Sequence, residues 1–327
     1  MDILTYNRRR VTLHRNRLKA PAKLVKFSFK FLKTQEGLME MNEKVRFPAV
    51  AGQFYEADPV KLKRDIARML ADIGEIEKFE GRARALVVPH AGYVFSGKTA
   101  LKTFSAASSS VYKRILIIAP SHRVPFQGLA FADYSVLRTP LGDMKVDTEA
   151  LGMLSSCPYI QQINQAHAYE HALEVELPFI QTLFPDIPII PFISGHLDVK
   201  TAENIAEALS VFWNEDTLWV ISSDFTHYGA NFSYCPFNSD IPENIKKLDM
   251  GAIEKILQFD LKGFSEYMAK TGATICGENP LKILLAEIAE NSASLSARLI
   301  EYTTSGEMTG DYSHCVSYAG IAVFEKK

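Results

Sequence analysis

From Arg46 onward, short runs of apolar and β-branched residues alternate with amphipathic stretches. This alternation is typical of a layered α/β domain. Leu116, Ile117 and Ile118 make one run apolar on both faces, which indicates a central strand covered by helices on both sides. The apolar runs predict strands at residues 84–89, 115–119, 187–193, 218–222, 298–304 and 316–324. The amphipathic stretches predict helices at residues 59–73, 97–104, 170–184, 201–213, 242–259 and 280–290.

Residues 1–38 differ from the rest of the chain because their charge is almost entirely basic, with Asp2 and Glu36 as the only acids. Such a segment could be a targeting or nucleic-acid-binding arm. We favour a poorly ordered N-terminal extension upstream of an alternative start at Met39 or Met41. No Ser/Gly/Pro-rich linker divides the chain after residue 46, so residues 39–327 are predicted to form a single domain.

Composition and charge bear on whether the protein binds nucleic acid or membranes and on the cellular compartment in which it works. The chain has 327 residues, 47% of them hydrophobic, and a formal net charge of -2, which gives the folded part no reason to bind nucleic acid. No run approaches the roughly 20 apolar residues that span a bilayer, so we expect no membrane association. The four cysteines form no CxxC pair, and a reducing cytoplasm is the compartment that this pattern favours.

Histidines follow three of the predicted strands. His90 comes after Pro89, His122 after Pro120 and Ser121, and His227 a few residues after the run that ends at Ser222. In α/β sheets, ligands bind beyond the carboxyl ends of the strands. These three histidines are therefore predicted to share a site, although a lone histidine is more often a structural residue than a ligand.

Two further segments carry candidate chemistry. Cys276 lies in a turn before a helix expected to open at Pro280, where the helix dipole would stabilise a thiolate as a metal ligand or nucleophile; a buried, inert cysteine is the alternative. The letters H-x-x-E-H at His167, Glu170 and His171 match the inverzincin signature, in which two histidines bind zinc beside a glutamate base. A metalloprotease therefore stays open as a lesser hypothesis.

Other common motifs are absent from the sequence. It contains no GxGxxG or Walker A loop, which argues against a bound nucleotide, and no GxSxG elbow of a serine hydrolase. The acidic and glycine-rich residues 305–311 are predicted to form a surface loop between two strands.

Together these segments resemble the Memo family (mediator of cell motility), whose microbial members are also described as protein B of the AmmeMemoRadiSam system. The similarity runs in the family's order from residue 46 to about residue 325. Its matching segments are RFPAVAGQFY (46–55), VPHAGY (88–93), PSH (120–122), TPLG (139–142), EHALEV (170–175), SSDFTHYG (222–229) and ICG (275–277).

The resemblance implies the three-layer α/β/α sandwich of the class III extradiol dioxygenases, with a metal pocket at one end of the sheet. Carried onto this sequence, the family's metal ligands are His90, His122 and Cys276. His227 matches the acid/base histidine of the dioxygenases, with Asp224 beside it as the residue expected to orient it. His171 and Glu170 match further pocket residues.

The resemblance to the dioxygenases stops at the chemistry of the ligands. Their iron is held by two histidines and a carboxylate, whereas Cys276 takes the place of the carboxylate here. A thiolate is softer, so the expected cofactor is one transition-metal ion, iron or copper, with zinc as a further candidate.

Two hypotheses follow for the function. The first is a metal-dependent redox enzyme or a metal-handling protein. The most specific version of this hypothesis is an enzyme with a dioxygenase-like reaction. The alternative is a non-catalytic binding module that uses the inherited pocket for a peptide or protein partner. The resemblance also implies a small-molecule or peptide ligand and a pathway link to a radical-SAM protein.

Overall fold

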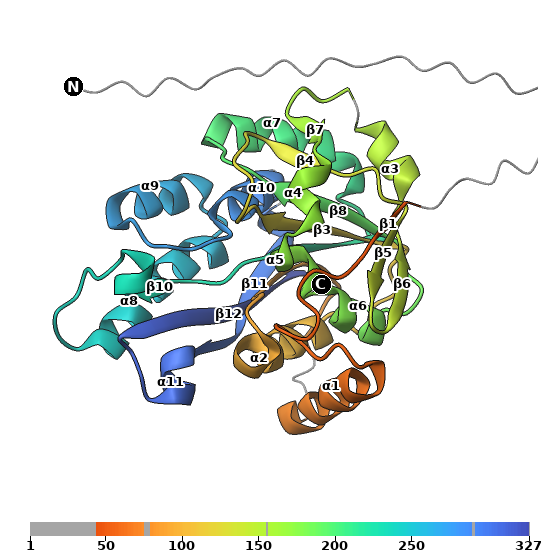
Figure 1. Cartoon of the computed structure of the whole chain (residues 1–327). Coiled ribbons are helices and arrows are strands. Elements are labelled where there is room, and N and C mark those ends of the chain that lie inside the picture. Colours follow the sequence, from red (N-terminus) through yellow and green to blue (C-terminus); the bar gives the residue numbers. More distant parts are fainter. Residues whose placement is uncertain (1–43, 75–78, 155, 290–291, 327) are drawn as a thin grey trace, which may run out of the picture. The chain divides into compact units, whose positions relative to one another are not determined.

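Apolar runs of the sequence form the middle of a nine-stranded mixed sheet in the computed structural model (Figure 1). The structure describes residues 44–74, 79–154, 156–289 and 292–326; the predicted extension at residues 1–38 lies outside them. Four neighbouring strands run parallel in the order β2-β9-β3-β8. Their bounds are β2 Ala83–Val88, β3 Arg114–Pro120, β8 Ile189–Ser194 and β9 Thr217–Ser222. They are buried on both faces almost throughout, as the uninterrupted apolar runs predicted.

The remaining strands of the main sheet flank this parallel centre. On one side, β12 (His314–Glu325) pairs antiparallel with β2, and both β10 (His227–Gly229) and β11 (Leu295–Thr304) pair with β12. On the other side, β4 (Leu129–Phe131) pairs with β8 and β7 (Ile160–Gln162) pairs with β4. A separate three-stranded sheet is formed by β1 (Val45–Arg46), β5 (Val136–Thr139) and β6 (Gly142–Lys145).

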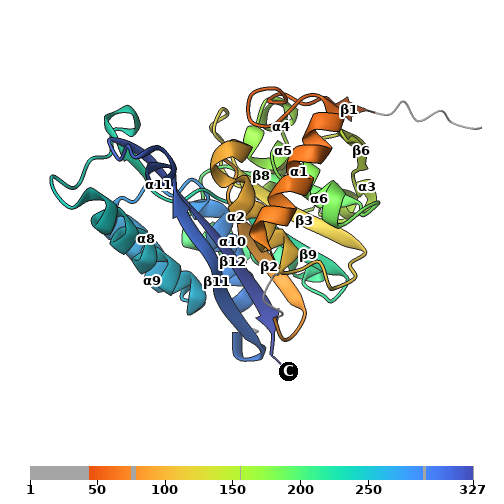
Figure 2. The same ribbon diagram turned by 90° about the horizontal axis from the view of Figure 1, so that it is seen from below.

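Helices cover both faces of the main sheet, which gives the predicted three-layer α/β/α sandwich. Figure 2 shows α2 (Tyr93–Ser105) and α1 (Pro59–Ile73) on one side of β11 and β12, and α8 (Ile241–Leu257) and α9 (Leu261–Thr271) on the other. The layer of α2 also contains α6 (Leu177–Leu183). The layer of α9 also contains α7 (Val199–Leu209) and α10 (Glu278–Ala289), of which α10 packs on β3 and β9.

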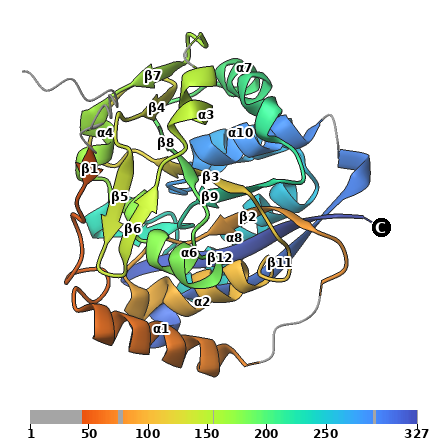
Figure 3. The same ribbon diagram turned by 90° about the vertical axis from the view of Figure 1, so that its right-hand side faces the viewer.

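Short elements complete the described part of the chain. Figure 3 shows β5 and β6 near α6, where Gln181 of α6 donates a hydrogen bond to the carbonyl of Gly142 over 3.0 Å. The short helices are α3 (Thr148–Met153), α4 (Asn164–Ala168), α5 (His171–Glu174), α11 (Ser305–Thr309), and the 3-10 turns η1 (Ser210–Phe212), η2 (Ala230–Phe232) and η3 (Ser292–Ser294).

Two predicted elements differ from the structure, and several elements of the structure were not predicted. The helix expected at residues 170–184 is broken into α5 and α6, because Pro178 lacks an N–H and its ring would clash with the carbonyl of Glu174. The loop expected at residues 305–311 contains α11, which begins with a capping box between Thr304 and Glu307 and ends at Gly310. Helix α9 was not predicted, although Asp260 caps its start and Gly272 its end.

None of the helices in the described ranges is both long enough and apolar enough to cross a bilayer.

Candidate metal centre

Three loops meet beyond the carboxyl ends of the parallel strands. His90 follows β2 and His122 follows β3, and β9 lies between these strands in the sheet. Because the strands are parallel, the loops that follow them leave the same edge of the sheet. The imidazole centroids of His90 and His122 are 5.3 Å apart. The strand-end argument thus predicted the meeting of these two side chains.

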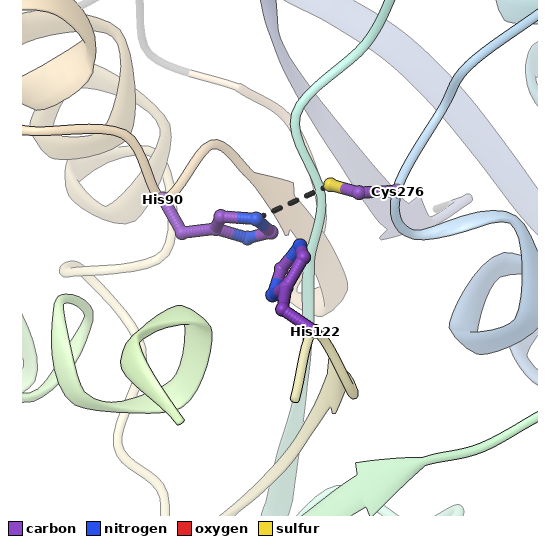
Figure 4. A group of neighbouring side chains, drawn as sticks. All are labelled: His90, His122 and Cys276. Atoms are coloured by element: carbon purple, nitrogen blue, oxygen red, sulfur yellow. Dashed lines mark hydrogen bonds between the residues drawn. The ribbon is translucent and has the colours of Figure 1, made fainter. Parts of the chain in front are cut away.

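Cys276 approaches the two histidines from a different part of the chain, the loop between α9 and α10. Figure 4 shows the three side chains pointing toward one another. The Sγ atom of Cys276 lies 3.2 Å from Nε2 of His90. One donor atom from each of the three residues lies within 4.8 Å of the other two. Among the described residues, only this group and the group of His122, Glu170 and His171 meet that criterion.

The Cys276 loop packs tightly on the end of β9. The backbone N–H of Gly277 donates to Oγ of Ser223 over 3.1 Å, and the N–H of Asp224 donates to Sγ of Cys276 over 3.1 Å. A Cβ atom on Gly277 would lie 2.2 Å from Cβ of Ser223. Glycine is therefore needed beside Cys276 for this close approach.

Glu170 orients His122. Its carboxylate is 1% exposed and accepts the backbone N–H of His122 over 2.7 Å and the ring Nδ1–H over 2.9 Å. Burial alone raises the pKa of Glu170, but hydrogen bonds from His122 and His171 outweigh it and hold the pKa far below its usual value. An ionised carboxylate that accepts Nδ1–H leaves Nε2 of His122 as the free donor atom for a metal.

His90 is held by groups at the end of β9. Its backbone N–H donates to Oδ1 of Asp224 over 2.8 Å, and its Nδ1 lies 2.8 Å from Oγ of Ser222. Burial, followed by the nearby His122 and His171, lowers the pKa of His90 well below its usual value. The imidazole is therefore neutral, which is the protonation state of a metal-binding histidine.

The thiol of Cys276 differs from the expectation based on a helix dipole. Burial, and then the charge of Asp224, raise the pKa of Cys276 well above its usual value. Without a metal, this burial favours the neutral thiol, in contrast to the thiolate expected from the helix dipole. A cation that binds here would displace the thiol proton, as metal ions do at cysteine ligands.

His227 lies near the site but is oriented differently from the expectation. Its Nδ1 lies 2.9 Å from the carbonyl oxygen of Phe225 and 3.0 Å from that of Thr274, so Nδ1–H donates to these carbonyls. Asp224 uses Oδ1 for the backbone of His90 instead. Burial raises the pKa of Asp224, and the charge of His227 opposes this rise. Asp224 therefore holds the backbone of His90 by a hydrogen bond, whereas it interacts with His227 only electrostatically.

The H-x-x-E-H segment does not form the single helix that an inverzincin site requires. His167 belongs to α4 and His171 to α5. Nε2 of His167 lies 2.9 Å from the carbonyl oxygen of Ala130, and burial lowers the pKa of His167 to about 4. His171 packs instead on His122, with ring centroids 4.6 Å apart. The two histidines of the motif therefore contact different parts of the protein and do not form a pair on one helix.

The sequence argument missed Ser222, which contacts Nδ1 of His90, and Glu176, which contacts Ser222. Ser222 is the last residue of β9, and Glu176 is fully buried between α5 and α6. The signal for Glu176 was its position within an apolar stretch, LEVELPF at residues 173–179, where a carboxylate needs a partner.

A cavity of about 710 Å³ lies next to this region, beside α1 and α2. Phe54 lines the cavity and packs against the ring of His171, with centroids 4.8 Å apart. The other apolar lining includes Leu62, Met69 and Phe95. None of the three clustered donors lines this cavity, so it is distinct from the metal centre itself.

A protein-family model and several known proteins match most of this chain. The family model described as Memo-like protein matches residues 46–322. A MEMO1 family protein of Thermococcus onnurineus is 36% identical over 86% of this chain and all of its own length. The memo-1 homolog of Caenorhabditis elegans is 33% identical over 90% of this chain and 87% of its own. Protein MEMO1 of Mus musculus is 30% identical over 84% and 95%. The chain therefore belongs to the Memo family.

Proposed function

We propose that His90, His122 and Cys276 bind one transition-metal ion, and that the protein uses this ion in redox chemistry or in metal handling. The observation that carries the proposal is the grouping of one sulfur and two ring nitrogens within 4.8 Å of one another. Bonds of about 2.1 Å to nitrogen and 2.3 Å to sulfur keep two donors of one ion within about 4.4 Å of each other, so the three donors need to move by at most a few tenths of an ångström to bind one ion.

The surroundings of the donors also fit a metal. Glu170 accepts Nδ1–H of His122, which is the carboxylate–histidine arrangement that orients metal ligands. His90 is neutral because it is buried. Cys276 is a thiol with a raised pKa whose proton a cation would replace. Each donor is therefore in, or one proton away from, its metal-binding state.

The donor set guides the choice of ion. One thiolate and two imidazoles suit iron, copper or zinc better than the hard cations magnesium and calcium. We propose iron or copper, with zinc as the redox-inactive alternative. When bound, such an ion supplies a Lewis acid, and iron or copper also supplies one-electron chemistry.

His227 is proposed to carry protons at this site. Because its Nδ1–H donates to the carbonyls of Phe225 and Thr274, its Nε2 bears the lone pair. A neutral histidine with a free Nε2 is suited to accept a proton from a ligand. Asp224 makes its hydrogen bond to the backbone of His90, and it is proposed to act on His227 only through its charge.

Metal analysis tests the proposal. The full chain is purified without added metal, and its metal content is measured for the wild type and for His90→Ala, His122→Ala and Cys276→Ala. We expect a stoichiometric transition metal in the wild type and its loss in all three variants.

The exposed residues His196 and Cys235 supply matched controls. His196→Ala and Cys235→Ser should keep the metal content of the wild type. A wild-type protein without bound iron, copper or zinc, or a His122→Ala variant that retains the metal, would contradict the proposal.

A further inference from the structure

Behind the metal centre, a buried carboxyl group reaches His90 through a serine hydroxyl. Oγ of Ser222 makes three contacts of 2.8 Å each: to Nδ1 of His90, to Oε1 of Glu176 and to the carbonyl oxygen of Ala172. Ser222 and Glu176 are both 0% exposed. Oε2 of Glu176 has no hydrogen-bond partner in the described part of the chain.

Counting protons fixes the direction of these bonds. Three contacts need three protons, and a serine hydroxyl supplies one. The carbonyl of Ala172 has none to give, so the hydroxyl proton of Ser222 serves that contact. The other two protons must then come from Glu176 and from His90. Any other assignment leaves two oxygen atoms, or an oxygen and a nitrogen, facing each other at 2.8 Å without a proton.

We infer that Glu176 is a neutral carboxylic acid that donates to Ser222, and that Ser222 in turn holds His90 as the tautomer with its proton on Nδ1. This tautomer directs the lone pair of Nε2 toward Cys276, whose Sγ lies 3.2 Å away. Glu176 and Ser222 are thus positioning residues for a metal ligand, a role that rests on the proposed metal function.

The environment of Glu176 supports a neutral acid. Burial raises its pKa well above the usual value, and the charge of Asp224 adds to the rise. An ionised group would leave a charged Oε2 buried without a partner, which is strongly unfavourable. A protonated group leaves only a neutral carbonyl oxygen unpaired, which costs less.

The arrangement differs from that of His122. There an ionised carboxylate, Glu170, accepts Nδ1–H directly over 2.9 Å. At His90 a neutral hydroxyl intervenes, so this imidazole receives less electron density from its partner. The two histidines would therefore bind the ion with unequal strength, His122 being the more basic ligand.

Two measurements on metal-free protein, by NMR and by infrared spectroscopy, test the inference without depending on metal binding, and Co²⁺ affinity adds a third. Nitrogen-15 NMR of labelled histidine in the full chain should show His90 protonated on Nδ1 at neutral pH. The variant Ser222→Ala should lose this preference and populate the Nε2–H form. The control Ser194→Ala changes a buried serine that ends β8 and should leave the tautomer unchanged.

Infrared spectroscopy tests the carboxylic acid. The difference between wild type and Glu176→Gln should contain the band of one protonated carboxyl group at pH 7. This variant keeps an N–H donor toward Ser222, so it should fold and retain Co²⁺ affinity within about threefold, whereas Ser222→Ala should lose about 10- to 100-fold. The infrared arm stands even if Ser222→Ala does not fold.

The outcomes separate this inference from the proposed function. An Nε2–H tautomer in the wild type, an Nδ1–H tautomer that persists in Ser222→Ala, or a missing carboxyl band would overturn the inference. If the tautomer of His90 and the carboxyl band of Glu176 are as expected but the wild-type protein binds no metal, the hydrogen bonds from Glu176 through Ser222 to His90 are supported and the proposed metal function is wrong.

Discussion

Arg46 and Glu174 form an ion pair that water hardly reaches, since their side chains are 3% and 0% exposed. The carboxylate of Glu174 also accepts the backbone N–H groups of Ala49 and Val50 and the hydroxyl of Tyr55. Replacing the cation by an apolar side chain leaves this buried charge uncompensated. We expect Arg46→Met to lower the free energy of unfolding by about 3–5 kcal/mol in urea titrations.

The control for this variant is an exposed pair. Nζ of Lys200 lies 3.2 Å from Oε2 of Glu203, and the Lys200 side chain is 75% exposed. Lys200→Met should change the free energy of unfolding by less than about 1 kcal/mol. Equal effects of the two substitutions would show that burial of the Arg46 pair contributes nothing.

His167 should make the stability of the protein depend on pH. Burial lowers its pKa to about 4, partly opposed by the bond to Ala130. The unfolded chain takes up a proton near pH 6.5, while the folded protein does so only near pH 4. The part of the free energy of unfolding that depends on neutral His167 is therefore fully present above pH 6.5. About 3 kcal/mol of it is lost as the pH falls toward 4.

Urea unfolding at several pH values measures this loss. His167→Gln, which keeps an N–H near the carbonyl of Ala130, should flatten the fall in stability between pH 6.5 and pH 4. The exposed residue His196 supplies the control, because His196→Gln should leave the slope as it is in the wild type. A slope that His167→Gln does not reduce would contradict the assignment.

At the site, the sequence could indicate residues whose position follows from a strand end. His90 and His122 were found in this way because parallel strands deliver their following loops to one edge. Cys276 comes from a loop between two helices of another layer, so its position before a helix made it only one candidate, and the family resemblance was needed to place it with the two histidines. Ser222 contacts Nδ1 of His90 and Glu176 contacts Ser222, and such contacts have no sequence period.

At the scale of elements, the contact between the Cys276 loop and β9 depends on one glycine. A Cβ on Gly277 would lie 2.3 Å from Oγ of Ser223 as well as 2.2 Å from its Cβ. The loop would have to move, and Cys276 with it. We expect Gly277→Ala to lower Co²⁺ affinity by about 10-fold or more and the free energy of unfolding by about 1–3 kcal/mol.

Gly152 provides the matched control for this variant. It lies in α3, and an added Cβ would meet nothing within 4 Å. Gly152→Ala should leave Co²⁺ affinity unchanged and stabilise the helix by about 0.5–1 kcal/mol. An unaltered affinity in Gly277→Ala would mean that the position of Cys276 does not depend on this contact.

The elements that the sequence predicted are those with long apolar runs. The strands of the parallel centre are buried on both faces and stand out for that reason. By contrast, β4, β7 and β10 have three residues each, too few to show a period of two. The place of β12 next to β2 is set by packing of distant segments and could not be inferred from either run alone.

At the scale of the whole molecule, the proposed metal centre joins parts of the chain that are far apart. His90 and Cys276 are separated by 186 residues, and their loops belong to different layers. An unfolded chain does not hold these donors together, so the ion would bind the folded state in preference. Such binding stabilises a protein by about 2.7 kcal/mol when the free ligand is at 100 times its Kd.

Thermal unfolding of the metal-free protein tests this linkage. Co²⁺ at 100 times its Kd should raise Tm of the wild type by about 4 °C, because about 1 kcal/mol corresponds to roughly 1.5 °C when each of the 327 residues contributes about 2.1 cal/mol/K to the entropy of unfolding. Cys276→Ala should show no shift at the same concentration, whereas Cys235→Ser, which changes an exposed thiol, should keep it. Excess chelator should return the wild type to the metal-free Tm. If Cys276→Ala shifts as much as the wild type does, the ion binds elsewhere, and the three donors do not form the centre that links the layers of the fold.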